Sequence, residues 1–278
     1  MRHLSSAALT VGAVLLLPTI STQAKIAGNK LAGNTLAAFS AAANSSAASR
    51  LAASPLAVEQ LAPDTYALDP ASAADLLSSE DGREVLTFIL SCALPENVTL
   101  RASTPEGDAL EFFGDIGLAD EWLDHPLREA GRGWVSACLF ARVNAHAVAL
   151  PISLRGPNKA LAATREEAQT YTLEEGAFYG DYFVAPGESL SWIACRGADQ
   201  ASGETGGLIS RDCAEPALGD QTVTECGFTY ASDCGEFAPE QACKHFAPRD
   251  VYRTCYAAPI GDADARPFRE VITVYVLP

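Results

Sequence analysis

Eight cysteines constrain this 278-residue chain more than any other feature of its sequence. Their number is even, and no two of them have the Cys-x-x-Cys spacing that is typical of structural zinc sites. In an exported protein such a pattern predicts disulfide bonds rather than a metal site, although spacing does not fix which cysteine pairs with which. We therefore expect no metal, and we expect disulfides among Cys92, Cys138, Cys195, Cys213, Cys226, Cys234, Cys243 and Cys255.

The first 24 residues predict export. Arg2 supplies a positive charge, residues 7–17 are uncharged and mostly apolar, and small residues at positions 22 and 24 match what signal peptidases read. The apolar run is too short to cross a bilayer, which takes about 20 helical residues. We assign residues 1–24 to a signal peptide, with a buried N-terminal helix as the alternative. The prediction is a secreted, periplasmic or cell-surface protein with no transmembrane segment.

The charge balance narrows the choice of partners. With 35 acidic and 19 basic residues, the chain has a formal net charge of −16. Such a surface repels phosphate backbones, so nucleic acid is not an expected partner, and it is not attracted to anionic membranes. The charge suits a protein dissolved in salty or crowded extracellular fluid. Surface polysaccharide and another envelope protein remain the partners to consider.

A period of five follows the signal peptide. Alanine recurs every five residues from position 27 to position 67 without a gap. This period fits neither a helix nor a strand, and it is typical of stacked coils. The segment resembles the pentapeptide-repeat family, which implies a square β-helix over residues 25–69. A flexible Ala-rich tether and an Ala-rich helix are the alternatives. In each case we expect residues 25–69 to lie outside the main core.

Residues 70–196 predict the core of an α+β fold. Helices and strands are interspersed there without the regular strand–helix alternation of βαβ units, which favours the α+β class over the α/β class. Apolar spacing and the stop at Pro95 predict the first helix, and Gly133 to Ala145 reads as a core helix because it is almost entirely apolar. The expected helices cover 71–94, 120–127 and 133–145, and the expected strands cover 98–102, 109–113, 149–154, 177–184 and 190–195.

The C-terminal part has a different composition. Residues 197–278 are rich in Gly, Pro and Cys, so we expect loops stapled by disulfides. Residues 269–276 are the exception, because their β-branched run predicts a strand that returns to the core. The expected fold is thus a disulfide-stabilised α+β domain with a Cys-rich, loop-heavy C-terminal part, preceded by the short repeat.

Known catalytic motifs are absent. The sequence has no His-Glu-x-x-His, Gly-x-Ser-x-Gly, P-loop or Gly-x-Gly-x-x-Gly pattern, and we expect no cofactor. Ser136 and His146 could form a nucleophile and base, but a serine within an apolar helix more often bonds back to the preceding turn. Cys138 has apolar neighbours that do not suit a reactive thiolate, so we expect it to form a disulfide with Cys92.

The most unusual polar cluster lies around residue 175. Glu174, Glu175 and Asp181 stand beside aromatic residues and glycines, and paired carboxylates with aromatic walls are typical of glycoside hydrolysis. The alternative is an ordinary strand in which Phe178, Gly180 and Tyr182 face one way and Tyr179 and Asp181 the other, with all three carboxylates solvated. Two further acidic residues, Asp262 and Asp264, do not complete a calcium-binding pattern.

Several short sequence segments together resemble a family of uncharacterised, Cys-containing secreted proteins of Gram-negative soil bacteria. They are spread over nearly the whole mature chain and include Ser91-Cys92-Ala93-Leu94-Pro95, Trp134-Val135-Ser136-Ala137-Cys138-Leu139, Glu175-Gly176-Ala177-Phe178-Tyr179-Gly180 and Glu270-Val271-Ile272-Thr273-Val274-Tyr275. The resemblance implies secretion and a shared architecture, and it implies no particular activity.

Two functional hypotheses follow. The first is a non-catalytic exported module that acts in binding or surface assembly, because chemical motifs are missing and disulfides are abundant. The second is an extracellular glycoside or peptide hydrolase that uses the carboxylates near Glu175. A concave site with convergent polar groups would favour the second.

Overall fold

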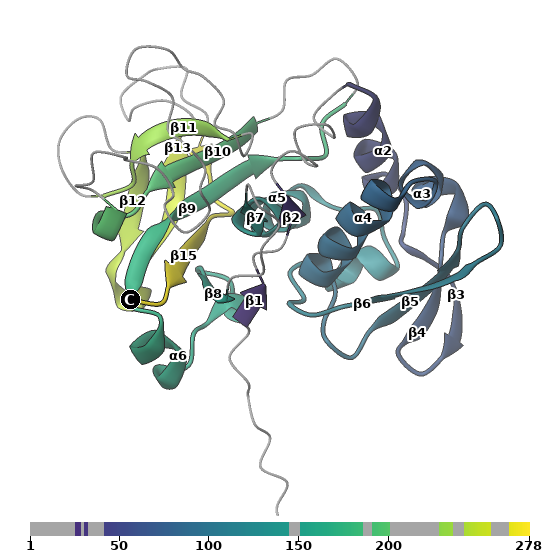
Figure 1. Cartoon of the computed structure of the whole chain (residues 1–278), viewed down its shortest axis with the longest axis horizontal. Coiled ribbons are helices and arrows are strands. Elements are labelled where there is room, and N and C mark those ends of the chain that lie inside the picture. The colour runs from purple at the N-terminus through teal and green to yellow at the C-terminus, as the bar shows by residue number, and fades with distance from the viewer. Residues whose placement is uncertain are drawn as a thin grey trace, which may run out of the picture.

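The computed structural model describes residues 26–28, 31–32, 42–144, 151–185, 191–200, 228–235, 242–256 and 267–278. The expected signal peptide lies outside these residues. Figure 1 shows two parts side by side: a four-stranded sheet covered by helices, and a larger sheet with a smaller one stacked on it. Helix α5 (Glu129–Ala141) lies between them. Helices together with mixed sheets confirm the α+β class.

The four-stranded sheet contains both a hairpin that the sequence predicts and one that it does not. Its order is β3-β4-β5-β6, so β3 and β6 are the edge strands. Strands β5 and β6 form the expected antiparallel pair, with Leu100 and Phe112 buried on the helix side and Arg101 and Glu111 exposed. The strand bounds are β3 (Ala57–Ala62), β4 (Thr65–Leu68), β5 (Thr99–Ser103) and β6 (Ala109–Phe113).

The helix predicted over residues 71–94 is two helices, α3 (Pro70–Leu77) and α4 (Glu80–Ala93). The break occurs at Ser79, whose backbone is extended and whose Oγ accepts a hydrogen bond from the Gly82 N–H at 3.0 Å. Asp69 caps α3 in the same way, accepting from the Ala71 N–H at 3.1 Å. Because two good N-caps lie within one apolar stretch, the chain starts a second helix instead of extending the first.

The expectation that residues 25–69 lie outside the main core is wrong. Residues 42–52 form helix α2 (Ala42–Ala52), and β3 and β4 follow it within the same segment. The helix buries Ala47, Ala48, Leu51 and Ala52, which lie on one face because they are four residues apart in pairs. Over eleven residues the helical preference of alanine outweighs the period of five. The described residues of this segment form neither a β-helix nor a tether.

The start of that segment also joins the fold. Strand β1 (Ile26–Gly28) pairs with β8 (Pro151–Arg155), and β2 (Leu31–Ala32) pairs with β7 (Val143–Asn144). Residues far apart in the sequence therefore share sheets, which is a further reason why the segment is not a separate spacer.

The larger sheet has six strands in the order β1-β8-β15-β9-β10-β11. Its last strand in sequence, β15 (Ile272–Val276), lies between β8 and β9, and every residue of β15 is buried. The expected C-terminal strand thus returns to the core, as its unbroken apolar and β-branched run requires. The other strands are β9 (Leu173–Asp181), β10 (Ser191–Arg196) and β11 (Thr229–Asp233).

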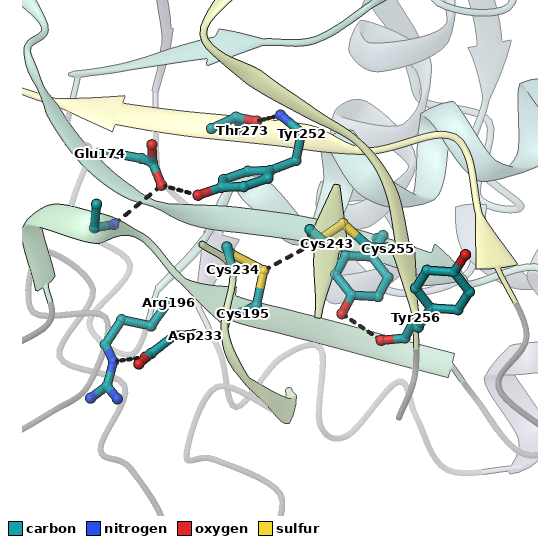
Figure 2. Close-up of a disulfide and its surroundings, with 12 residues drawn as sticks. Glu174, Cys195, Arg196, Asp233, Cys234, Cys243, Tyr252, Cys255, Tyr256 and Thr273 are labelled. Carbon is teal, nitrogen blue, oxygen red and sulfur yellow. Dashed lines mark hydrogen bonds and ion pairs between the residues drawn. A yellow bond between two sulfur atoms is a disulfide. The ribbon is translucent and has the colours of Figure 1, made fainter. Parts of the chain in front are cut away.

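A three-stranded sheet, β12-β13-β14, stacks on this larger sheet. The backbone N–H of Tyr252 in β13 donates to the Thr273 Oγ in β15 at 2.9 Å, which ties the two layers together (Figure 2). The strands are β12 (Cys243–Phe246), β13 (Val251–Tyr256) and β14 (Pro267–Phe268), and the remaining short elements are α6 (Arg165–Thr170), η1 (Asp120–Leu123), η2 (Lys159–Leu161), η3 (Ala198–Gln200) and η5 (Ala247–Arg249).

Helix α5 is the central element of the core. It packs against α4 on one side and β9 on the other, and Val135, Leu139 and Phe140 are fully buried. A disulfide between Cys92 in α4 and Cys138 in α5 joins the two helices, as expected from their apolar surroundings. One continuous core surrounds α5 and reaches from α2 to β15. Among the described helices, none is long and apolar enough to cross a membrane.

Candidate functional site

Strand β9 places two of the three candidate carboxylates in the interior. Glu174 is 7% exposed and Glu175 is fully buried, so the expectation that both are solvated is wrong. The register against β15 shifts here: Gly176 pairs with Val274 and Glu174 with Tyr275, which leaves Glu175 as an extra residue. This bulge resets the alternation of side chains along the strand. It turns Glu174 toward the three-stranded sheet, where its carboxylate meets Tyr252.

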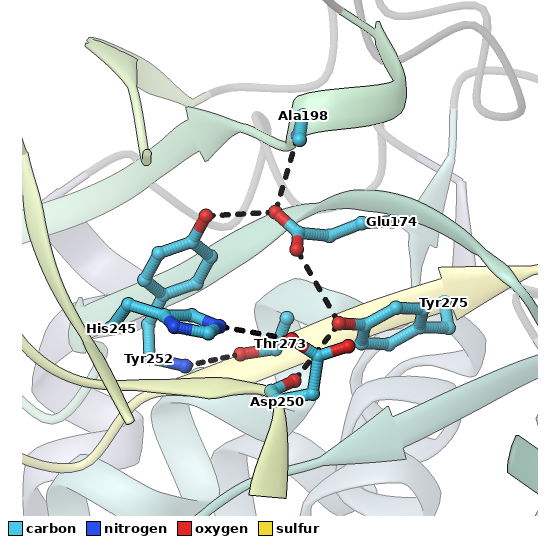
Figure 3. A network of polar contacts seen from close by, with 7 residues as sticks. All are labelled: Glu174, Ala198, His245, Asp250, Tyr252, Thr273 and Tyr275. Carbon is cyan, nitrogen blue, oxygen red and sulfur yellow. Dashed lines mark hydrogen bonds and ion pairs between the residues drawn. The ribbon is translucent and has the colours of Figure 1, made fainter. Parts of the chain in front are cut away.

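The Glu174 carboxylate is the centre of a polar network (Figure 3). Its Oε1 accepts hydrogen bonds from the Tyr252 hydroxyl at 2.9 Å and from the Ala198 N–H at 3.2 Å. Its Oε2 lies 3.3 Å from the Tyr275 hydroxyl, which also donates to the Asp250 carbonyl oxygen at 2.9 Å. A buried carboxylate is stable only when such donors surround it. The network supplies them from three separate segments of the chain.

Burial raises the pKa of Tyr275. The negative charges of Glu174 and Asp250 raise it further, and the positive charge of Arg155 opposes the shift. A neutral Tyr275 keeps its hydroxyl proton and can continue to donate, which is what the carboxylate and the carbonyl beside it need. The group therefore behaves as a fixed hydrogen-bond donor in the ordinary pH range and not as a proton-transfer group.

A cation stacks on the other side of Tyr275. The Arg155 guanidinium lies 3.8 Å from the ring centroid, and its Nε donates to the Ser153 Oγ at 2.9 Å. Ser153 in turn donates to Glu167 at 2.6 Å. Burial lowers the pKa of Arg155, while Tyr275 and Glu167 oppose that shift. Every polar group in this chain of contacts has an internal partner. Together the contacts hold strands β8 and β15 against helix α6.

The third candidate, Asp181, lies at the far end of β9. Its Oδ2 is 2.8 Å from the Arg132 Nη2 in α5, and its Oδ1 accepts from the Phe183 N–H at 2.9 Å. It lies seven positions after Glu174 along the extended strand, a distance of about 23 Å. Carboxylate pairs that hydrolyse glycosides lie within about 10 Å of each other. Asp181 therefore cannot act together with Glu174 or Glu175 on one glycosidic bond.

The serine candidate also has a structural contact. The Ser136 Oγ accepts a hydrogen bond from the Tyr182 N–H at 2.9 Å, so it holds the end of β9 against α5 and does not bond back to its own helix. Its proposed base, His146, lies outside the described residues, as do Asp262 and Asp264. After the bulge, Phe178 and Tyr182 face the main core, while Tyr179 faces a second, smaller core that also contains Ile193 and Tyr252. The predicted alternation is confirmed for Phe178, Tyr179 and Tyr182.

Three disulfides lie within the described residues. Besides Cys92–Cys138, Cys195 in β10 bonds to Cys234, which follows β11, and Cys243 in β12 bonds to Cys255 in β13. No free cysteine is found in the described part of the chain. Cys213 and Cys226 lie outside it, so their pairing remains a prediction. Sequence reasoning could not find the last two pairs, because their partners are set by which strands become neighbours within each sheet.

Comparison of the chain with models of protein families, with curated proteins and with solved structures finds no match. The resemblance to secreted proteins of soil bacteria therefore stays a prediction from the sequence. The functional argument depends on the geometry of the described residues alone.

Proposed function

We propose that this chain is an exported, disulfide-stabilised module that binds another protein of the cell envelope and has no catalytic activity of its own. The observation that supports this most is the placement of the three carboxylates. Glu174 is satisfied by internal donors, Glu175 is fully buried, and Asp181 pairs with Arg132 about 23 Å along the strand. This arrangement supports a structural role for these groups and disfavours the alternative, an extracellular hydrolase that uses them.

A surface suited to binding lies on the four-stranded sheet. Of the exposed large apolar side chains in the described residues, Val58 and Leu61 belong to edge strand β3 and Phe113 to edge strand β6. Edge strands have unpaired backbone groups that can accept a strand from a partner. The sequence left a surface polysaccharide and an envelope protein open as partners. Exposed apolar side chains on strand edges favour the protein.

A first experiment tests the absence of catalysis. The purified protein is incubated with peptidoglycan, polysaccharides and peptides, and we expect no turnover. The variants Glu175→Gln and, as a matched control on the exposed strand β3, Glu59→Gln are run in parallel. Turnover by the wild-type chain that Glu175→Gln abolishes, with the circular dichroism spectrum unchanged and Glu59→Gln active, would establish the hydrolase instead.

A second experiment tests the binding surface. A photo-crosslinking amino acid replaces Leu61, Phe113 or, as a control, Leu277, which is also exposed but lies at the end of the chain outside this sheet. We expect a crosslinked species of one defined mass from position 61 or 113 in the native host and none from position 277. Equal labelling at all three positions, or none, would argue against the proposed surface.

A further inference from the structure

Two disulfides lie against each other between the stacked sheets. The sulfur atoms of Cys195, Cys234 and Cys243 all lie within 4.8 Å of one another, and the contact between Cys195 and Cys243 is 3.3 Å (Figure 2). Each of these residues, like Cys255, is at most 2% exposed. Four sulfurs therefore share one buried space that solvent does not enter.

The two bonds are both internal to a sheet. Cys195–Cys234 links β10 to the residue that follows β11, its neighbour in the six-stranded sheet, and Cys243–Cys255 links two directly opposed residues of β12 and β13. The contact between Cys195 and Cys243, by contrast, crosses from one sheet to the other. A bond at that contact would join the two layers covalently.

We propose that these four cysteines form one interchange unit, in which opening either disulfide transfers the bond to Cys195 and Cys243. Disulfide exchange requires a thiolate to reach a sulfur of an existing disulfide. When an external thiolate attacks the Cys234 sulfur, it forms a mixed disulfide with Cys234 and releases the Cys195 thiolate. That thiolate already lies in contact with the sulfur that it would attack.

The second step conserves electrons within the protein. The Cys195 sulfur attacks the Cys243 sulfur, the Cys195–Cys243 bond forms, and the Cys243–Cys255 bond breaks. Cys255 leaves as a thiolate and takes up a proton. Because the four residues are buried in the folded protein, the external thiol gains access while the C-terminal part is still folding. In the reverse direction, the Cys255 thiolate attacks the Cys243 sulfur and releases the Cys195 thiolate, which attacks Cys234 in its mixed disulfide and expels the external thiolate. One bond between the sheets and one mixed disulfide thus become the two bonds within the sheets.

The test removes one cysteine and follows the free thiol. In the variant Cys234→Ser of the full chain, Cys195 has lost its partner. We expect alkylation and peptide mapping under non-reducing conditions to find a Cys195–Cys243 bond and the free thiol on Cys255. In Cys255→Ser, the reverse transfer should give the same bond and a free thiol on Cys234. The matched control is Cys138→Ser, in which the thiol should stay on Cys92, because that disulfide lies apart in the main core.

The double variant Cys234→Ser/Cys255→Ser tests the geometry if a single variant fails to fold. It should form Cys195–Cys243 directly and leave neither residue open to alkylation. The proposal is overturned if the thiol stays on Cys195 in the first variant and on Cys243 in the second, or if Cys195 pairs with Cys213 or Cys226. It is also overturned if the double variant, with its circular dichroism spectrum intact, keeps Cys195 and Cys243 as free thiols.

Discussion

At the scale of single residues, buried polar groups were the hardest to predict. The sequence draws attention to Glu174 because two carboxylates stand beside aromatic residues, yet its partners Tyr252 and Tyr275 lie 78 and 101 positions further along the chain. No local pattern connects residues so far apart. The network exists because two sheets stack at this point, and stacking is a property of the complete fold. The same reason explains why a cluster that suggests catalysis proves to be structural.

Removing a donor from this network should destabilise the fold. Tyr252→Phe leaves the buried Glu174 carboxylate one hydrogen bond short, so we expect a loss of about 1–3 kcal/mol in the free energy of unfolding. The matched control is Tyr66→Phe, since Tyr66 is half-buried and its hydroxyl has no hydrogen bond within the described residues; it should change stability by less than about 0.5 kcal/mol. Urea unfolding measures both. Equal effects would mean that the carboxylate does not depend on its donor.

The same residues predict how stability changes in alkaline solution. Burial raises the pKa of Tyr179, Tyr182 and Tyr275 above the ordinary value of 10.0. The unfolded chain therefore loses these protons first, and stability that is complete below pH 10.0 falls as the pH rises further. Arg142 and Arg155 act in the opposite direction, because burial lowers the pKa of Arg142 to about 10 and also lowers the pKa of Arg155. Three tyrosines against two arginines give a net loss.

This prediction is checked by ultraviolet absorbance of tyrosinate during an alkaline titration. We expect three of the eight tyrosines to ionise only together with the loss of the folded circular dichroism signal. Each ionisation contributes about 1.4 kcal/mol per pH unit to the loss, so the transition should be steep. Smooth ionisation of all eight in a folded chain would show that these tyrosines are not buried as described.

At the scale of elements, local signals were reliable where one segment carried its own pattern. The pair β5 and β6, the apolar helix α5 and the strand β15 were predicted, because alternation, an all-apolar face and a β-branched run each identify an element without help from the rest of the chain. The period of five led to a wrong prediction for residues 25–69, because the repeat is present in the sequence but too short to form stacked coils. Helix α2 and the hairpin of β3 and β4 form instead, since the core offers their apolar residues a place to pack.

The pairing of strands β9 and β10 depends on one glycine. Gly180 has a φ of 141°, and a Cβ there would lie 1.7 Å from the Ser191 carbonyl oxygen. We expect Gly180→Ala to destabilise the protein by at least about 3 kcal/mol, because backbone strain and a backbone clash add together. Gly107 is the matched control: its φ is 98° and a Cβ would meet nothing within 4 Å, so Gly107→Ala should lose only the strain, about 1–2 kcal/mol. The denaturant midpoints of the two variants show whether Gly180→Ala loses more stability than Gly107→Ala.

Helix α2 provides a test of whether the Ala-rich segment belongs to the core. Leu51 is fully buried, so Leu51→Ala should destabilise the protein by about 2–5 kcal/mol. Leu61, from the same period-five segment, is 47% exposed, and Leu61→Ala should cost less than about 0.5 kcal/mol. Urea unfolding again gives the comparison. If both variants unfold like the wild-type chain, the segment would be a tether after all.

At the scale of the whole molecule, one core joins parts that look separate in the ribbon drawing (Figure 1). Trp122 makes the junction. Its indole N–H donates to the Ser54 carbonyl oxygen at 3.0 Å on the side of the four-stranded sheet, and its ring meets Phe183 edge-on at 5.7 Å just beyond β9. The disulfide between Cys92 and Cys138 links the same two parts through α4 and α5. The parts therefore share their apolar interior.

A shared interior predicts a single unfolding transition. Hydrogen exchange measured against urea should give one midpoint for the amides of α4 and of β9, because neither part can expose its side of the core alone. Trp122→Ala removes the ring between them and should lower both midpoints together, by about 3–5 kcal/mol in stability. The exposed aromatic Phe113 supplies the control, since Phe113→Ala should leave both midpoints in place. Two midpoints in the wild-type chain would show that the two parts fold independently and that the continuous core does not couple them.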